Sequence, residues 1–187
     1  TSVVVACLAH LRPEKDHALL LEAFAMVVRD CPYAILLLIG DGPLRQSIRD
    51  TITALRLDSS VRLLGFCENV PDILAASDLG VLSSRYEGMP LAVLQMMASG
   101  LPVVATRVGG IEALVQEEVT GTLVPHGRPE LLATALRRLI LDPDRRARLG
   151  SNGRRRAFSK FGAEHMAAEY ARLYLQAASA VLPQPVS

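Results

Sequence analysis

Apolar residues along the chain alternate between short unbroken runs and longer stretches in which they recur every three or four positions. The run Ala34–Ile39 (AILLLI) contains no polar residue, which is typical of a strand covered on both faces of a parallel sheet. The stretch before it, from Asp16 as N-cap to Asp30, predicts a helix. One face of that helix is apolar, through Leu20, Ala23, Phe24, Val27 and Val28.

The same alternation continues to the C-terminus and predicts six strands separated by helices. We expect strands at residues 2–7, 34–39, 61–64, 79–82, 102–106 and 122–124. We expect helices at 16–30, from the turn 40–43 to about 56, at 71–76, 91–99 and 111–116, and then almost continuously after 129, with a terminal helix at 162–181 and a flexible tail at 183–187. This pattern is typical of the α/β class, here a Rossmann-like, doubly wound parallel sheet forming one domain over residues 1–187.

Composition and charge limit the kind of protein. With 187 residues, half of them hydrophobic, the chain can bury one sizeable core. The formal net charge of +1 gives no reason to expect nucleic acid or an anionic membrane as partner, and no apolar run approaches the roughly 20 residues of a membrane-spanning helix. The widely spaced Cys7, Cys31 and Cys67 and the lack of a basic leader indicate buried, reduced thiols in a cytoplasmic protein. Membrane contact is expected to be peripheral at most.

The candidate site lies in the loops that follow the strands, because ligands of doubly wound sheets bind at the carboxyl ends of the strands. The most informative loop, YEGMPL at 86–91, leads into the helix at 91–99. Gly88 allows close backbone approach and Pro90 suits the first helical turn, whose free amides and dipole attract anions. Glu87 would repel a phosphate, so its natural partner is a neutral donor such as a sugar hydroxyl, and Gln95 can face the same cleft. The alternative is a plain loop with a surface acid.

The loop after the first strand carries a basic cluster of His10, Arg12 and Lys15. We expect it to point into the mouth of the cleft, where Lys15 suits a diphosphate; the alternative is a solvated turn. The sequence GDGP at 40–43 lacks the G-x-G-x-x-G spacing of a dinucleotide fingerprint. The pair Gly109-Gly110 either allows close backbone approach or is only a turn.

Other candidate chemistry is weak. The histidines have no partner at metal-ligand spacing, so we expect no zinc site built by the protein. Ser83-Ser84 lacks the glycines of a nucleophile elbow. Seven cations at 145–160 would suit an anionic acceptor or a membrane, but interleaved apolar residues favour a solvated helix face.

Several segments, in their order along the chain, resemble the C-terminal domain of retaining glycosyltransferases of the family 4 type, the glycosyl transferases group 1. They are AHLRPEKDHALLLEAFA, IGDGPLRQSI, VRLLGF, VPDILAASDLGVLSSRYEGMPLAVLQMMASGLPVVAT and GGIEAL, with a trailing helix around 163–175. Together they cover roughly residues 3–175. The resemblance implies a GT-B enzyme, in which two Rossmann-like domains enclose the active site and this chain is the donor-binding half.

The resemblance also implies roles for the candidate residues. Glu87 and Lys15 would be catalytic. The donor diphosphate would contact His10, Arg12, Lys15, Gly88, Met89, Leu91 and Ala92. The transferred sugar would contact Glu87, Gly88, Met89 and Pro90. The ribose and base would contact Gln95, Gly42, Phe66 and Val70.

The implied reaction transfers a hexose-type sugar from a UDP-, GDP- or ADP-sugar to a carbohydrate or lipid-linked acceptor. It is a same-face displacement in which the leaving phosphate helps to deprotonate the acceptor hydroxyl. No cofactor or metal is expected, because basic side chains and the helix dipole neutralise the diphosphate.

Two residues depart from the family pattern. His10 stands where the family usually has an arginine, and a histidine is shorter and only partly charged near pH 7. Gln95 stands where the family has a second glutamate, and it loses the stronger charged hydrogen bond to a ribose hydroxyl. These departures keep a second hypothesis open, a catalytically degenerate module that binds a nucleotide or a partner without turnover.

A third hypothesis is a GT-B sugar-nucleotide epimerase, which needs acid and base residues from a second domain. An NAD-binding domain is disfavoured by the missing glycine fingerprint. A GT-B enzyme needs an acceptor domain of comparable size, to which the terminal helix would normally cross, and 187 residues hold one domain only. We therefore expect the N-terminal acceptor domain to be missing from this chain, and the chain alone to bind donor weakly without transferring sugar.

Overall fold

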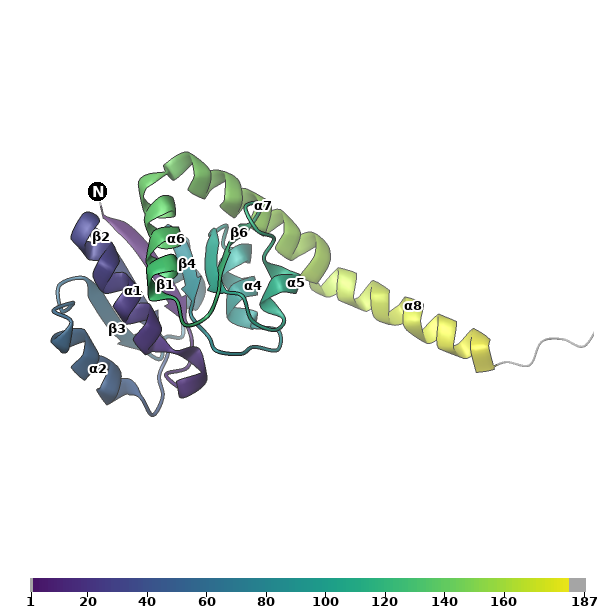
Figure 1. The fold of residues 1–187 in the computed structure, drawn as a ribbon. Helices are drawn as coiled ribbons and strands as arrows, with labels where there is room; N and C mark the ends of the chain where they lie inside the picture. The colour runs from purple at the N-terminus through teal and green to yellow at the C-terminus, as the bar shows by residue number, and fades with distance from the viewer. Residues whose placement is uncertain (1, 182–187) are drawn as a thin grey trace, which may run out of the picture.

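The computed structural model describes residues 2–181 and contains a six-stranded, all-parallel sheet with helices on both faces (Figure 1). The sheet order is β3-β2-β1-β4-β5-β6. The strands are β1 (Val3–Leu8), β2 (Ala34–Ile39), β3 (Val61–Gly65), β4 (Leu79–Leu82), β5 (Val103–Thr106) and β6 (Gly121–Val124). The predicted doubly wound, Rossmann-like fold is confirmed, while the tail predicted at 183–187 lies outside the described residues.

The helices lie close to their predicted positions. They are the 3-10 turn η1 (Pro13–Lys15), α1 (His17–Asp30), α2 (Arg45–Ala54), α3 (Val70–Ala75), α4 (Leu91–Ala98), α5 (Ile111–Leu114), α6 (Pro129–Leu141), α7 (Pro143–Phe161) and α8 (Ala163–Val181). Helix α2 ends earlier than predicted, and Arg56 just beyond it has a left-handed backbone with φ of 57°. Helix α5 is also shorter, because Val115 is extended. Pro90 is the N-cap of α4, one position before the first turn where we expected it.

Two apolar layers enclose the sheet. On one face α1, α2 and α6 pack on the sheet in a cluster that includes Phe24 and Leu36, and α6 lies over β5 and β6. On the other face α3, α4 and α5 pack in a cluster that includes Met96. Helix α7 joins the layers, since its Leu149 belongs to the first cluster and its Ala157 to the second. Every residue of β4 and β5 is buried, as expected of strands covered on both faces.

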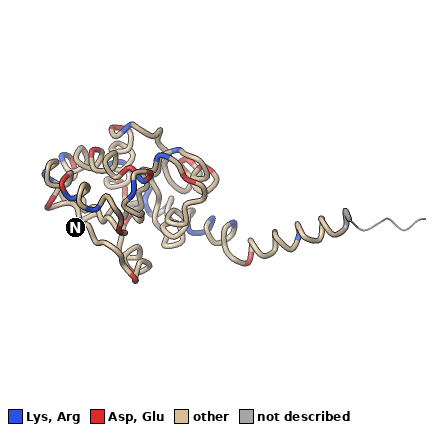
Figure 2. The backbone as a smooth tube through the Cα atoms, turned by 90° about the horizontal axis from the view of Figure 1, so that it is seen from below, with Lys and Arg blue, Asp and Glu red and all other residues tan. Residues whose placement is uncertain are grey.

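The basic segment of α7 is only partly the solvated face that we predicted. Arg145 pairs with Glu118, Arg146 donates to the last carbonyls of α6, and Arg156 donates to the last carbonyls of α5. These three side chains fasten α7 to its neighbours. Elsewhere positive and negative positions are interspersed over the domain (Figure 2). Helix α8 extends away from the sheet (Figure 1), and within the described residues no helix is long and apolar enough to cross a membrane.

His17, in the first turn of α1, makes stability depend on pH. Its side chain is buried, and neither ring nitrogen has a hydrogen-bond partner among the described residues. Burial lowers its pKa from 6.5 to about 4. The unfolded chain therefore takes up this proton at higher pH than the folded chain. As far as His17 is concerned, the free energy of unfolding is highest above pH 6.5 and falls as the pH drops toward 4. The decrease between pH 7 and pH 5 is about 2 kcal/mol.

We expect His17→Leu to remove most of that loss, because it deletes two nitrogens that make no hydrogen bond and adds no charge. Urea unfolding of wild type and variant at pH 7 and pH 5 measures the difference. The control is His165→Gln in α8, which should lose as much stability as wild type. An equal loss in His17→Leu would show that other groups cause the pH dependence.

Candidate functional site

A cavity of about 650 Å³ opens at the carboxyl ends of the strands where the strand order reverses, between β1 and β4. Doubly wound sheets bind ligands at such a point. The loops after β1, β2, β3 and β4 line the cavity, in agreement with a site in the loops that follow the strands. The lining residues are Leu8, Ala9, His10, Lys15, Ile39, Gly40, Asp41, Phe66, Cys67, Val70, Glu87, Met89, Pro90, Leu91, Ala92 and Gln95.

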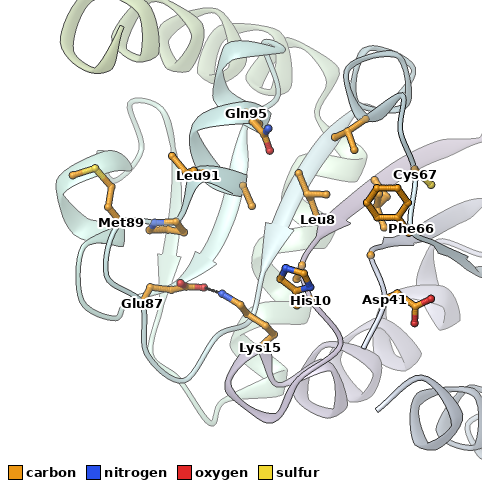
Figure 3. A pocket seen from close by; sticks show the side chains of 16 residues that line it. Leu8, His10, Lys15, Asp41, Phe66, Cys67, Glu87, Met89, Leu91 and Gln95 are labelled. Carbon is orange, nitrogen blue, oxygen red and sulfur yellow. Dashed lines mark hydrogen bonds and ion pairs between the residues drawn. The ribbon is translucent and has the colours of Figure 1, made fainter. Parts of the chain in front are cut away.

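Two groups of side chains face one another across the cavity (Figure 3). Glu87, Met89 and Leu91 lie on one side, at the start of α4. Phe66 and Asp41 lie on the opposite side, on the loops after β3 and β2. A ligand in the cavity would thus lie between the segment that leads into α4 and the loops after β2 and β3, and it would meet a carboxylate and apolar side chains on both sides.

Lys15 and Glu87 form an ion pair inside the cavity. Lys15 Nζ lies 2.6 Å from Glu87 Oε1, and the side chains are 20% and 8% exposed. Ser84 Oγ donates to the same carboxylate oxygen at 2.6 Å. An ammonium has three donors and Glu87 engages one, so Lys15 keeps donors for an anionic ligand. The other carboxylate oxygen of Glu87 can accept from a hydroxyl.

The loop that carries Glu87 is supported from behind by Gly109-Gly110. The amide of Gly110 donates to the Glu87 carbonyl at 3.3 Å. A Cβ on Gly109 would lie 2.0 Å from the Glu87 carbonyl oxygen, and one on Gly110 would lie 1.7 Å from that of Gly88. The close backbone approach is therefore real, and side chains at these positions would displace the loop.

Most predicted site residues line the cavity, but Arg12, Gly42 and Gly88 do not. Arg12 is exposed, and its amide donates to the carbonyl of His10 as η1 begins. Gly42 packs against Leu11, where a Cβ would lie 2.6 Å from the carbonyl oxygen. Arg12 and Gly42 lie outside the cavity lining because of the tight turns that contain them. The roles assigned to the residues that do line the cavity remain predictions.

Six lining residues were not among our candidates: Leu8, Ala9, Ile39, Gly40, Asp41 and Cys67. Leu8 and Ile39 end β1 and β2, so their apolar character indicated only core. Gly40 has φ of 135° and approaches Ala9, where a Cβ would lie 2.1 Å from the carbonyl oxygen. Their position at the ends of adjacent strands was the signal that could have identified them.

The cysteines are free, but the prediction that all three are buried is wrong. Cys67 is partly exposed, because it follows the edge strand β3 in a loop that lines the cavity. Cys7 is buried in β1, and burial raises the pKa of its thiol to about 12. Within residues 2–181 no group of three or more His, Cys, Asp or Glu side chains is arranged to hold a metal ion.

Comparison with known proteins extends this picture. The family described as Glycosyl transferases group 1 matches residues 1–156. The N-acetyl-alpha-D-glucosaminyl L-malate synthase of Bacillus anthracis is 35% identical over 153 residues, which are 82% of this chain and 40% of that protein. The UDP-Gal:alpha-D-GlcNAc-diphosphoundecaprenol alpha-1,3-galactosyltransferase of Escherichia coli is 32% identical over 144 residues, 75% of this chain and 37% of that protein.

A solved structure is similar to nearly the whole of this chain. Anabaena HepE in complex with UDP superposes with a TM-score of 0.87 at 28% identity, over 94% of this chain and 49% of that one. The fold is thus that of one Rossmann-like half of a GT-B protein. The chain belongs to the glycosyl transferases group 1 family, and it spans about two fifths of the length of the curated relatives it matches.

Proposed function

We propose that this chain is the donor-binding domain of a retaining glycosyltransferase that takes a hexose-type sugar from a nucleoside diphosphate sugar. The observation that carries the proposal is the pairing of Lys15 with Glu87 beside the N-terminus of α4. The ammonium and the free helix amides suit a diphosphate, and the adjacent carboxylate suits sugar hydroxyls. A cavity of about 650 Å³ accommodates a ligand of nucleotide-sugar size.

Two of the similar proteins favour a uridine nucleotide as donor. HepE has been crystallised with UDP and with UDP-glucose, and the name of the Escherichia coli relative includes UDP-Gal. In this chain Phe66 and Gln95 line the cavity away from the Lys15–Glu87 pair (Figure 3). Together with Val70, which also lines the cavity, they are proposed to contact the base and ribose.

The proposed chemistry needs no metal. Lys15 and the α4 amides stabilise the negative charge that develops on the leaving diphosphate. Glu87 holds the sugar, and the acceptor comes from a second domain. The chain alone is expected to bind donor without transferring sugar.

Calorimetric titration with UDP, UDP-glucose, GDP-mannose and ADP-glucose tests the proposal. We expect UDP-glucose to bind most tightly to the wild-type chain. In Glu87→Ala the affinity for UDP-glucose should fall roughly tenfold, to that for UDP, because one charge-assisted hydrogen bond to the sugar is lost. The control is Glu22→Ala, an exposed glutamate of α1. A folded chain that binds none of these nucleotides would refute the proposal.

Nucleotide binding without turnover is the second candidate function. His10 and Gln95 favour it, because both line the cavity in place of the charged residues usual in the family. A transfer assay with the protein that includes its acceptor domain separates the two, since turnover excludes the degenerate module.

A further inference from the structure

Asp16, the residue after Lys15, forms hydrogen bonds to three segments of the chain. Asp16 is 8% exposed. Its Oδ1 accepts from the amide of Leu19 at 3.3 Å, which caps α1. Its Oδ2 lies 3.0 Å from Arg85 Nε and 2.8 Å from His126 Nε2. Because an ionised carboxylate only accepts, His126 donates through Nε2. Arg85 follows β4 and His126 follows β6, so one side chain joins the loops of three strands.

The backbone around Lys15 is tied to the end of β4 as well. Ser83 is buried, and its hydroxyl lies 2.8 Å from the carbonyl oxygen of Lys15 and 3.0 Å from that of Asp16. The amide of Arg85 donates to the carbonyl of Glu14 at 2.8 Å. The loop that leads to Glu87 therefore holds the turn on both sides of Lys15.

Asp16 adopts a backbone conformation that is uncommon for residues other than glycine. Its backbone is left-handed, with φ of 44° and ψ of 55°, a region that costs non-glycine residues free energy. Glycine would adopt it without strain. Burial raises the pKa of the carboxyl, but hydrogen bonds from His126, Arg85 and the Leu19 amide and the charge of Arg85 lower it by more. Its pKa is therefore below the ordinary value, and the group is ionised at neutral pH.

We propose that Asp16, together with Arg85 and His126, is a positioning group that holds the Lys15 ammonium where it meets both Glu87 and the donor diphosphate. The inference rests on the proposed function. None of the three residues lines the cavity, so Asp16 acts on the ligand through Lys15 and not by contact.

Asp16→Asn removes this restraint and little else. Asparagine tolerates the left-handed backbone, and its amide oxygen can still cap α1. The amide nitrogen in place of Oδ2 cannot accept from Arg85. We expect calorimetry to show UDP affinity lowered roughly fivefold or more in the wild-type chain, and less than about twofold in the Lys15→Ala chain, because residues that act through one another are not additive. Arg85→Gln, which removes the same bond from the other partner, should behave alike.

The matched control is Asp142→Asn. Asp142 also caps a helix, since it accepts from the amide of Arg145 at 2.8 Å at the start of α7, but it lies in neither the cavity lining nor the Asp16 network. Its replacement should leave UDP affinity unchanged. Thermal unfolding of every variant confirms that each is folded.

A spectroscopic measurement reports on Lys15 directly. The chain has two lysines, Lys15 and Lys160, so a protein labelled with [ε-¹³C]lysine gives one signal from the site and one reference signal from α7. Asp16→Asn should shift the Lys15 signal and leave that of Lys160 in place. An equal loss of affinity in both backgrounds, or unchanged affinity and an unmoved Lys15 signal, would overturn the inference. If the wild-type chain binds no nucleotide, the proposed function fails, and the Lys15 signal still tests whether Asp16 positions it.

Discussion

Replacing Lys15 with alanine is expected to weaken UDP binding roughly 10- to 100-fold and to leave uridine binding within about twofold of wild type. A charge-assisted hydrogen bond to a phosphate contributes about 1.5–3 kcal/mol, and uridine has no phosphate to lose it. Lys15 lines the cavity, and its side chain forms an ion pair with Glu87. Calorimetric titration of both ligands gives the two ratios.

Lys160→Ala is the control, because it removes the other lysine, which lies on α7 outside the cavity. Without Lys15 the carboxylate of Glu87 lies unpaired beside the phosphates, so part of the measured loss is repulsion. The double variant Lys15→Ala/Glu87→Ala separates this part from the direct contact. If uridine binding falls as much as UDP binding, the substitution has distorted the cavity and the charge argument is wrong.

The exposed apolar residues of α8 are consistent with a second domain that completes the molecule. Met166, Tyr170 and Tyr174 are each more than half exposed, and the two tyrosine rings stack on one another. Such residues on a helix that extends away from the sheet suit a contact with further protein. The domain organisation predicted from the family resemblance remains a proposal that this surface supports.

The fold was predictable because it follows from local patterns. An unbroken run such as Ala34–Ile39 indicates a strand buried on both faces, and the i, i+3, i+4 spacing around Phe24 indicates a helix with one apolar face. The general location of the site was predictable for a topological reason, since parallel strands present their carboxyl ends at one edge of the sheet. That rule led to Lys15 and Glu87, which are 72 positions apart in the sequence and lie in contact.

The network around Asp16 was not predictable. His126 is 110 positions from Asp16, and neither residue has a spacing that indicates the other. In the sequence Asp16 is simply a good N-cap, which it also is in the structure. Arg12 is the opposite case, a predicted site residue that does not line the cavity. Its place two residues from His10 suggested a shared ligand, but the turn at η1 leaves Arg12 outside the cavity lining. Polar contacts between distant segments depend on backbone geometry that residue type alone does not determine.

Gly109→Ala is expected to abolish detectable sugar-dependent binding, because the glycine pair determines where Glu87 lies. Gly109 has φ of 49°, and a Cβ there would lie 2.0 Å from the Glu87 carbonyl oxygen. Two effects add: the left-handed backbone costs alanine about 1–2 kcal/mol, and the overlap forces a backbone shift that costs about 1–3 kcal/mol more. The shift moves Glu87 away from Lys15 and Ser84, so UDP-glucose should lose its advantage over UDP.

Comparison with Gly100→Ala isolates the effect of the steric overlap. Gly100 is also left-handed, with φ of 81°, but a Cβ there would meet nothing within 4 Å, and it lies at the opposite end of α4 from the cavity. Gly100→Ala should lower the free energy of unfolding by the same roughly 1–2 kcal/mol that the left-handed backbone costs, and it should bind UDP-glucose as wild type does. Urea unfolding and calorimetry of both variants make the comparison. Equal stabilities and equal affinities would show that the Glu87 loop can move aside freely, and that Lys15 and Ser84, not the glycine pair, fix the position of the carboxylate.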